Sequence, residues 1–598
     1  MSNFQFHFKN NLPHQEGAIN STLALFKGME RKESYFSIVD VRKNRTTSGN
    51  VAKGVANNIS IDSEELSFNL EEIQNKNGFT YNEEEEKEIK NNCIVPKDFT
   101  IEMETGTGKT YVYIKTALEM SKQYGIKKFI VVVPSVAIRE GVKKTLEITK
   151  KHFENSYEPY EYFVYDSSNF SQIKEFGRSK ITQIMVINID AFNSQGNRKI
   201  YDIQEQTDGN KPIDIIKETN PVVIIDEPQS VTGESTLKKP TKGVLAIREL
   251  NPSMILRYSA THRVRTHELY KLDAVDAYQE GLVKEIMVNS VIIDEDFNEP
   301  YIYVVSIDRD KKQARLRLNI KSKNTYIRKV KTVKQDDDLA VITGNNKYEG
   351  FKILEIGFKE KNEYIKIRNL VKPLDLTENR EYGSTDSDEI KRFQIRQTIR
   401  EHLEKEIRLR IANKNRGRVK VLSLFFIDKV DNYVIYDGNT RVKNGKFAKM
   451  FEEEYPRILN QFFDRVTTSE ELEVLNELKK QELSKIHDGY FSKDKATTFV
   501  EYKTDKDGNY KLTSKDDRTF DLIMRDKEKL LSLDNPLRFI FSHSALKEGW
   551  DNPNVFQICT LNETKSQIKK RQEIGRGLRL AVDEFGKRIE EGTQRQIN

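Results

Sequence analysis

Short, almost wholly apolar runs alternate with segments of helical period along the first 265 residues. Isoleucine, valine and leucine dominate the runs and predict strands at residues 100–103, 129–133, 184–189, 222–225 and 254–258. Apolar positions at Val112, Ile114, Ala117 and Leu118 predict a helix after the first strand. Strands of this kind are typical of a parallel sheet covered on both faces. We therefore predict a doubly wound α/β domain over residues 1–265.

The period of the pattern changes to two between about residues 287 and 370. Apolar Ala314, Leu316 and Leu318 alternate with Arg315 and Arg317, which predicts a strand with one apolar and one basic face. We predict a linker and a β-rich insertion over residues 266–392. Its lysines and arginines could bind phosphates or a protein partner, and a sheet face that contacts only water explains them at least as well.

Helical periodicity returns at residues 393–411 and is followed by predicted strands at 419–426, 537–541 and 555–561. We predict a second α/β domain over residues 393–598. The lysine- and glutamate-rich stretch 431–534, with a loop at 505–510, is interpreted as a segment inserted in it. The fold class is therefore α/β: two doubly wound parallel-sheet domains with a β-rich insertion between them. The acidic run 83–86 is interpreted as a solvated helix face or loop.

Composition narrows the class of protein only a little. A chain of 598 residues is too long for one hydrophobic core. The net charge of +6 permits a nucleic-acid partner without arguing for one. Two cysteines, Cys93 and Cys559, exclude a disulfide framework and a zinc site and suit a reducing cytosol. No apolar run reaches the ~20 residues that span a bilayer, and the first 20 residues lack a signal-peptide core. We predict a cytoplasmic protein with no membrane contact.

The strongest candidate for chemistry lies between the first strand and its helix. A glycine loop ending in Gly-Lys-Thr, between a strand and a helix, cradles nucleotide phosphates with backbone N–H groups and the positive helix end. Lys109 is predicted to reach the outer phosphates, and the Thr110 hydroxyl to hold Mg²⁺. Met103 replaces the first glycine of the general pattern. The residues predicted to bind the nucleotide are Thr105, Gly106, Thr107, Gly108, Lys109 and Thr110.

Two later strands end in further candidate residues. The run 221–225 leads into Asp226 and Glu227, and ligands of doubly wound sheets bind at the carboxyl ends of strands. Asp226 is therefore predicted to contact Mg²⁺ and Glu227 to orient an attacking water. A surface Asp-Glu pair that only ends a strand is the minority interpretation downstream of a phosphate loop. Small hydroxyl residues after the next strand, in Ser259-Ala260-Thr261, can relay hydrogen bonds to a neighbouring domain.

A second strong signal is the segment Gln572-Glu573-Ile574-Gly575-Arg576-Gly577-Leu578-Arg579. Arg576 and Arg579 are spaced to share one helical face, and guanidinium groups stay protonated at neutral pH. Planar guanidinium groups suit the charge that develops on a transferred phosphoryl group. A basic helix facing solvent is the alternative, but two helical glycines cost ~1 kcal/mol each relative to alanine. We therefore expect a turn or a close approach here.

In their sequences and in their order along the chain, these motifs resemble those of superfamily 2 helicases or translocases with two RecA-like domains. More narrowly, the chain resembles the Res (restriction) subunit of type III restriction–modification enzymes. The resemblance covers nearly the whole chain. Besides the segments above it rests on Asp226-Glu227-Pro228-Gln229-Ser230, Ser259-Ala260-Thr261-His262, Leu422-Ser423-Leu424-Phe425-Phe426-Ile427-Asp428, His487-Asp488-Gly489-Tyr490-Phe491 and Leu546-Lys547-Glu548-Gly549-Trp550-Asp551-Asn552-Pro553.

The resemblance implies an ATP-hydrolysing motor that acts on double-stranded DNA, with ATP and Mg²⁺ as cofactors and a methyltransferase (modification) subunit as partner. It implies that Gln15 reads adenine and that Asp551 contributes to the ATP site. It further implies DNA-backbone contacts by Pro134, Ser135 and Gly549. Coupling roles between hydrolysis and the neighbouring domain fall to Gln229, Ser259, Ala260, Thr261 and Gln572, and Arg576 and Arg579 complete the catalytic set with Lys109 and Glu227.

Type III Res subunits resemble a motor followed by a nuclease domain with an Asp…Glu-X-Lys core. The chain stops at Asn598, soon after the arginine segment, so we expect the nuclease domain to be missing, by truncation or by absence. Two alternatives to a type III Res subunit stay open. One is another superfamily 2 DNA motor, such as a type I restriction motor or a repair helicase. The other is a DNA-binding scaffold that binds ATP without useful turnover.

Overall fold

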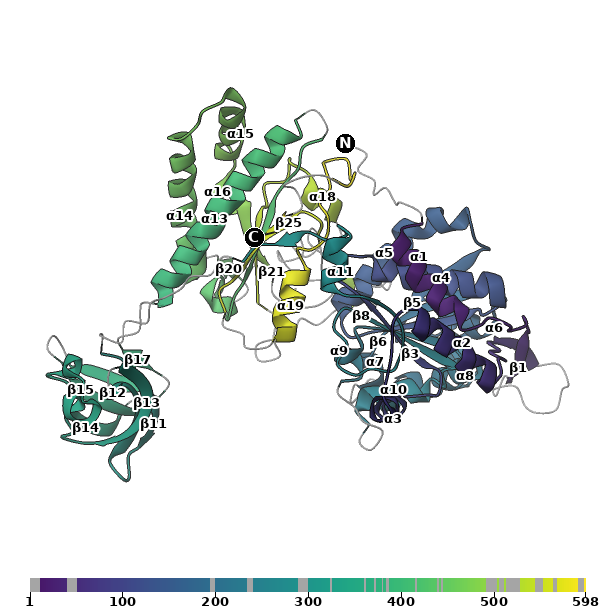
Figure 1. Cartoon of the computed structure of the whole chain (residues 1–598), viewed down its shortest axis with the longest axis horizontal. Coiled ribbons are helices and arrows are strands. Elements are labelled where there is room, and N and C mark those ends of the chain that lie inside the picture. Colours follow the sequence, from purple (N-terminus) through teal and green to yellow (C-terminus); the bar gives the residue numbers. More distant parts are fainter. Residues whose placement is uncertain are drawn as a thin grey trace. The chain divides into compact units, whose positions relative to one another are not determined.

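The structure, a computed structural model, divides into two compact units (Figure 1). The large unit comprises Met1–Val288 and Thr398–Asn598, and the small unit comprises Asn289–Gln397. The structure describes every residue of the chain except 1–10, 40–50, 194–198, 234–239, 289–299, 323–324, 360–361, 370–372, 379, 383–386, 415–416, 438–439, 443–444, 491–502, 505–509, 512–526, 544–551, 563–566, 590–595 and 598. No helix among the described residues combines the length and apolar character needed to cross a membrane.

The large unit contains a seven-stranded sheet in which all neighbouring strands are parallel. Its strand order is β5-β6-β4-β7-β8-β3-β9. The bounds are β3 (Asp98–Met103), β4 (Lys128–Val133), β5 (Tyr160–Val164), β6 (Thr182–Asn188), β7 (Val222–Asp226), β8 (Met254–Ser259) and β9 (His267–Leu272). The five strands predicted in this region are confirmed, whereas β5 and β9 were not predicted. These two edge strands carry polar residues such as Glu161 and Lys271, which mask the apolar pattern.

Successive residues of the central strands enter two different cores. In β4, Phe129, Val131 and Val133 pack on one face, while Ile130 and Val132 pack on the other. This alternation buries both faces of the sheet, which explains why the strands read as continuous apolar runs. One core is completed by α1 (Pro13–Ala24), α2 (Ser63–Lys76), α4 (Lys109–Tyr124) and α5 (Val136–Glu154). The other is completed by α6 (Ser171–Arg178), α8 (Pro212–Glu218) and α10 (Lys242–Glu249).

Shorter elements surround this sheet. The antiparallel strands β1 (Ser34–Val39) and β2 (Val51–Ala56) form a separate pair. The acidic run 83–86 forms the exposed first turn of α3 (Glu83–Asn92), and Asn82 caps that helix in a capping box with Glu85. This confirms a solvated helix face. Negative charge at a helix N-terminus is favourable because it offsets the helix dipole.

A second parallel sheet, of order β21-β24-β18-β25, follows in the large unit. Its strands are β18 (Leu422–Phe426), β21 (His487–Tyr490), β24 (Phe539–Ser542) and β25 (Val555–Thr560). The neighbouring helices are α13 (Ser387–Ala412), α14 (Lys446–Phe463), α15 (Ser469–Lys479), α16 (Leu483–Ile486), α18 (Lys527–Leu531) and α19 (Gln567–Gly575). The strand β21 lies inside the stretch 431–534, which the sequence pattern had suggested was only an inserted segment. Its short His-Asp-Gly-Tyr sequence lacks an apolar run.

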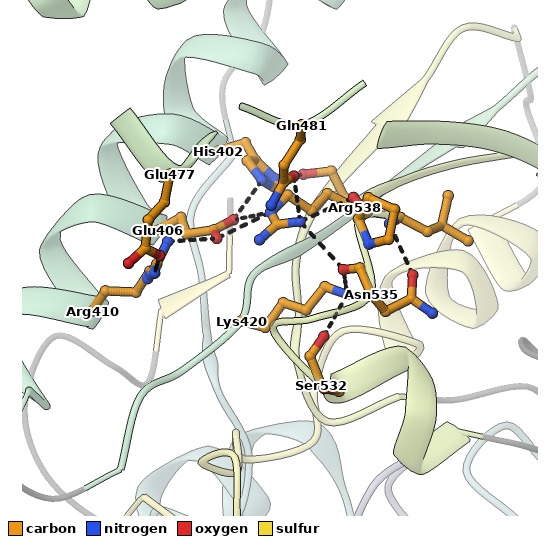
Figure 2. Close-up of polar contacts among 12 residues, drawn as sticks. His402, Glu406, Arg410, Lys420, Glu477, Gln481, Ser532, Asn535 and Arg538 are labelled. Carbon is orange, nitrogen blue, oxygen red and sulfur yellow. Dashed lines mark hydrogen bonds and ion pairs between the residues drawn. The ribbon is translucent and has the colours of Figure 1, made fainter. Parts of the chain in front are cut away.

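A buried polar cluster joins α13 to the second sheet (Figure 2). The Arg538 guanidinium lies 3.0 Å from both carboxylate oxygens of Glu406, and His402 bridges Glu406 (3.1 Å) and Ser423 (2.8 Å). Burial raises the pKa of Glu406, but the charge of Arg538 and the hydrogen bond with His402 outweigh it and lower the pKa to about 2. Although Ser423, His402 and Glu406 are connected like a hydrolase triad, all three are fully buried. No substrate can reach Ser423, so these groups satisfy one another's hydrogen bonds inside the fold.

The small unit is built from antiparallel strands around its own core. One sheet has the order β13-β12-β11-β17 and the other β14-β15-β16. The bounds are β11 (Ile302–Asp308), β12 (Gln313–Ser322), β13 (Thr325–Lys334), β14 (Lys352–Lys359), β15 (Asn362–Arg368), β16 (Leu374–Thr377) and β17 (Glu381–Tyr382), with the short helix α12 (Leu339–Thr343). The two-residue period therefore predicted a β-rich insertion correctly. The α/β fold class, with two parallel sheets and this insertion, is confirmed.

Candidate nucleotide site

The loop after β3 is held in a fixed shape by its own hydrogen bonds. The Thr107 hydroxyl donates to the Glu104 carbonyl (2.7 Å), and the Glu104 N–H donates to the Leu272 carbonyl at the end of β9 (2.9 Å). Gly106 and Gly108 have φ angles of +89° and +100°, which side chains with a Cβ rarely adopt. Gly108 caps α4, which begins at Lys109. The first backbone N–H groups of α4 therefore point out of this loop, as phosphate binding requires.

Lys109 and Glu227 form an ion pair across the sheet end. The Lys109 ammonium donates to Glu227 Oε1 at 2.8 Å, and the two side chains are 12% and 21% exposed. Burial lowers the pKa of Lys109, but the charges of Glu227 and Asp226 outweigh it and hold that pKa above its usual value. Burial raises the pKa of Glu227, yet Lys109 and the hydrogen bonds to the carboxylate lower it to about 2. Both groups are thus ionised at neutral pH.

The carboxylate of Glu227 is also the centre of a hydrogen-bond relay. Gln229 Nε2 (2.6 Å) and the Ser259 hydroxyl (2.7 Å) both donate to its Oε2. Gln229 Nε2 also donates to the Thr261 hydroxyl (3.2 Å), and the Thr261 N–H donates to Ser259 (3.0 Å). Glu227 has a φ of 56°, a left-handed conformation that costs a non-glycine residue about 1–2 kcal/mol. The strand end aims this carboxylate at Lys109 in spite of that strain.

Oxygen atoms suitable for Mg²⁺ gather beside this pair. The Tyr113 hydroxyl donates to Asp226 Oδ2 at 3.3 Å and is also hydrogen-bonded to Thr110. Burial, followed by the charge of Asp226, raises the pKa of Tyr113 well above its usual value, so it remains a neutral donor. One phenol therefore brings the Thr110 hydroxyl and the Asp226 carboxylate together. Mg²⁺ prefers oxygen ligands and usually takes one or two from protein, so this donor set fits the ion.

The N-terminal helix α1 supports the loop from the other side. Gln15 Nε2 and His14 Nε2 both lie 3.0 Å from the Thr107 carbonyl. A Cβ at Gly108 would collide with the Gln15 amide. Gln15 therefore contacts the phosphate loop directly, and its predicted contact with adenine stays a prediction. Pro134 and Ser135 follow β4, where the Ser135 hydroxyl accepts from Ile138 N–H and caps α5. That cap gives Ser135 a structural role besides the predicted DNA contact.

The arginine segment packs on the phosphate loop, but its geometry differs from the prediction. The helix α19 ends at Gly575, Arg576 lies in the following turn, and Arg579 forms a β-bridge with Val283. The two arginines do not share a helical face, because the helix stops at the glycine. A Cβ at Gly575 would lie 3.2 Å from the Thr105 Cβ, and one at Gly106 would lie 3.1 Å from the Arg579 Cγ. The expected close approach at a glycine is thus present.

Three predicted site residues lie wholly or partly outside the described residues. Gly549 and Asp551 lie outside the described residues, and Gln572 belongs to α19 but its side chain lies outside them too. Ala260 is buried directly after β8, between Ser259 and Thr261. The roles proposed for these residues stay predictions.

Sequence reasoning missed the segment that connects the phosphate loop to the arginine segment. After β9 the chain forms α11 (Ala274–Gln279), and the short strand β10 (Glu285–Ile286) then pairs with β26 (Gln596–Ile597). Between them, the Lys284 N–H donates to the Leu578 carbonyl (2.8 Å). The buried Lys284 ammonium donates to the carbonyls of Pro553 (2.6 Å) and Val555 (2.7 Å). Burial lowers the pKa of Lys284 well below its usual value. No local motif marks this lysine.

Comparison with known proteins agrees with these motifs. Residues 11–264 match the family model described as type III restriction enzyme, res subunit. The Res subunit of the type III restriction-modification enzyme EcoP15I from Escherichia coli is 32% identical over 98% of this chain and 56% of that protein. The chain is thus similar in sequence to type III Res subunits. The EcoPI Res subunit from Escherichia phage P1 is 30% identical, again over 98% of this chain and 56% of its own length.

The chain thus spans about half the length of the curated Res subunits that it matches. Solved structures are more distant. The type ISP restriction-modification enzyme LlaBIII bound to DNA has a TM-score of 0.36 and 12% identity over 82% of this chain and 26% of that one. The Mycobacterium smegmatis helicase Lhr bound to ssDNA and AMP-PNP has a TM-score of 0.35 and 11% identity over 81% and 42%.

Proposed function

We propose that this chain is the ATP-hydrolysing DNA motor part of a type III restriction Res subunit. The observation that carries the proposal is the meeting of Lys109, Glu227 and the arginine segment around one glycine loop. These are the groups that phosphoryl transfer needs: a cation for the phosphates, a carboxylate for the water, and guanidinium groups for the developing charge. The relationship to Res subunits over nearly the whole chain supports the same conclusion.

Lys109 is paired with Glu227, so ATP must compete with this carboxylate for the ammonium. Once the phosphates pair with Lys109, the Glu227 carboxylate is released to accept a hydrogen bond from water, while Ser259 and Gln229 still hold its other oxygen. Thr110 and Asp226 would hold Mg²⁺, which neutralises phosphate charge when bound. Because Gln229 touches both Glu227 and Thr261, a change at the carboxylate passes to the end of β8.

The nucleic-acid substrate and the partner are further parts of the proposal. We propose double-stranded DNA as the polymer on which the motor acts and a methyltransferase subunit as the partner that recognises sequence. The curated relatives are Res subunits of restriction-modification enzymes, and LlaBIII is a restriction-modification enzyme bound to DNA. We propose that DNA cleavage depends on the part of the longer relatives that does not align with these 598 residues.

Phosphate release by the purified chain, with and without duplex DNA and the methyltransferase, tests this function. We expect hydrolysis that DNA stimulates. Arg576→Lys keeps the charge but loses the planar fork, and we expect turnover to fall by about 10³-fold, the lower range for an arginine finger. Arg571→Lys, an exposed position of α19, is the matched control and should be neutral. Absence of ATP turnover in the wild-type chain under all conditions, or equal turnover by both variants, would refute the proposal.

A further inference from the structure

A strongly basic segment lies in the small unit, far along the sequence from the nucleotide site. Strands β12 and β13 form an antiparallel hairpin that pairs from Gln313↔Lys334 to Ser322↔Thr325. Residues 313–334 contain eight lysines and arginines and no aspartate or glutamate. The chain as a whole has 99 basic and 93 acidic residues, so this hairpin holds more net positive charge than the entire molecule.

The basic side chains of this hairpin point into solvent. Exposed positions alternate with the core in β12, where Leu316 and Leu318 are fully buried. The strand β13 is an edge strand, and its lysines project beyond the core although they pair with those leucines. The exposed basic residues, called the basic hairpin surface from here on, lie on the outer face of the sheet and along its free edge. Arg315, Arg317, Lys321, Arg328 and Lys334 belong to the outer face, and Lys329 and Lys331 belong to the edge on the side of the core.

Several of these charges are not neutralised within the small unit. Among the described residues, Arg315, Lys329, Lys331 and Lys334 form no ion pair. Other basic residues of the same unit do have carboxylate partners, as in Arg309–Asp310, Lys311–Asp308, Lys352–Asp336 and Lys366–Asp375. Like charges on neighbouring strands repel, and a polyanion relieves that repulsion. Lysines on an edge strand also discourage other strands from pairing with it, but that role does not require arginines on the flat face of β12.

The aromatic residues beside this surface distinguish between kinds of nucleic acid. The Arg328 guanidinium lies 4.1 Å from the ring centre of Tyr301, and that of Arg317 lies 5.3 Å from the ring centre of Tyr303. Proteins that bind single strands offer free aromatic faces on which bases stack. Here guanidinium groups cover a face of each ring, so the surface presents charge instead. A ten-residue strand is about 33 Å long, close to one turn of B-DNA.

We propose that the basic hairpin surface binds the phosphate backbone of duplex DNA, as a contact separate from the nucleotide site. This inference rests on the proposed function, because it assumes that the chain acts on DNA. Contacts to phosphate carry no sequence information, so the surface should bind unrelated duplexes alike. Each lysine or arginine that contacts a phosphate releases a counterion, which makes the affinity depend on salt.

The test compares two variants of the full chain with the same change in charge. The hairpin variant is Arg315→Gln, Lys329→Gln, Lys331→Gln and Lys334→Gln. The control variant is Arg309→Gln, Lys311→Gln, Lys352→Gln and Lys366→Gln, which removes ion-paired residues of the same unit. Fluorescence anisotropy measures binding to two unrelated 30-base-pair duplexes and to a 30-nucleotide single strand from about 50 to 200 mM KCl. ATP hydrolysis without DNA and thermal unfolding report whether each variant remains folded.

We expect the hairpin variant to bind duplex at least about tenfold more weakly at 100 mM KCl, with a salt slope smaller by about 2–4. The control should bind like the wild type, and both variants should keep the hydrolysis seen without DNA. Equal duplex binding by the hairpin variant and the control would overturn the inference and favour an acidic protein as the occupant. Tighter wild-type binding to the single strand than to duplex would overturn it as well. Failure of the wild-type chain to bind any DNA would instead refute the proposed function.

Discussion

The ion pair between Lys109 and Glu227 leads to a prediction about Glu227→Gln. In the wild-type carboxylate, Lys109 donates to one oxygen while Ser259 and Gln229 donate to the other. A glutamine offers only one acceptor oxygen, and its NH₂ group needs an acceptor. If the amide oxygen of the new glutamine faces Ser259 and Gln229, its NH₂ group faces the Lys109 ammonium, which is also a donor. If the amide oxygen faces Lys109 instead, the NH₂ group faces the donating amide of Gln229. At least one of these donors loses its acceptor in either orientation.

The energy of that loss sets the size of the effect. A hydrogen bond to a charged group is worth about 1.5–3 kcal/mol net, and tenfold in affinity is 1.4 kcal/mol. If ATP competes with Glu227 for the Lys109 ammonium, as proposed, a weaker Lys109–Glu227 pair should tighten ATP binding. We expect the Kd for ATP to fall by about tenfold. Turnover should fall by at least about 10²-fold, because the carboxylate proposed to orient the attacking water is gone.

Titration calorimetry with ATP and a phosphate-release assay measure the two effects separately. Glu161→Gln, whose carboxylate accepts from Gln183 at the edge strand β5, is the control and should change neither quantity. Because the pKa of Glu227 is about 2, its carboxylate stays ionised and its ion pair with Lys109 should not change between about pH 5 and pH 8. Weaker ATP binding with unchanged turnover would show that Glu227 supports the fold and has no part in hydrolysis.

Three other variants test the phosphate loop, the arginine segment and a buried lysine. Lys109→Ala should abolish turnover, since the triphosphate loses a charge-assisted contact worth about 1.5–3 kcal/mol before any transition-state effect; near-normal phosphate release would contradict the loop assignment. Lys284→Met should lower kcat by at least about fivefold while the Kd for ATP changes by less than about twofold. It removes the ammonium's hydrogen bonds to the Pro553 and Val555 carbonyls, which loosens the strand β25 that precedes the arginine segment and leaves the phosphate loop intact. An equal change in kcat and in Kd would contradict this. Burial lowers the pKa of Lys128 to about 7, so between that pH and about 10.5 the unfolded chain binds more protons and stability rises with pH. Urea unfolding should therefore show wild type gaining about 2 kcal/mol over Lys128→Met from pH 7 to pH 9, and parallel pH profiles would contradict it.

The apolar pattern predicted the central strands because their environment is uniform. Strands β4, β7 and β8 are buried on both faces, and such strands need little besides isoleucine, valine and leucine. The edge strand β5 and the sheet strand β21 carry mixed side chains, since one is exposed along an edge and the other consists of only four residues. The pattern therefore gave no signal for either of them.

Motif spacing identified candidate site residues without giving their contacts. The pairing of Lys109 with Glu227 depends on strand order, which places β8 between β3 and β7. The position of Arg576 depends on where α19 ends, and helix ends are difficult to predict when glycines follow one another closely. Lys284 lies outside every motif because its partners are backbone carbonyls, which any sequence provides. Contacts of this kind follow from the fold alone.

The short connection from Leu272 to Lys284 bears on whether the arginines are supplied by the same chain as the phosphate loop or by another subunit. The Leu272 carbonyl accepts from the phosphate loop and the Lys284 N–H donates to the arginine segment, so one short stretch of chain contacts both halves of the proposed site. A tether of this length keeps the guanidinium groups at a local concentration in the millimolar range or above. The arginines should thus act in cis, and turnover per chain should not change on dilution. Mixing Lys109→Ala chains with Arg576→Lys chains should give no complementation, whereas a motor with sites between subunits would regain activity from the mixture.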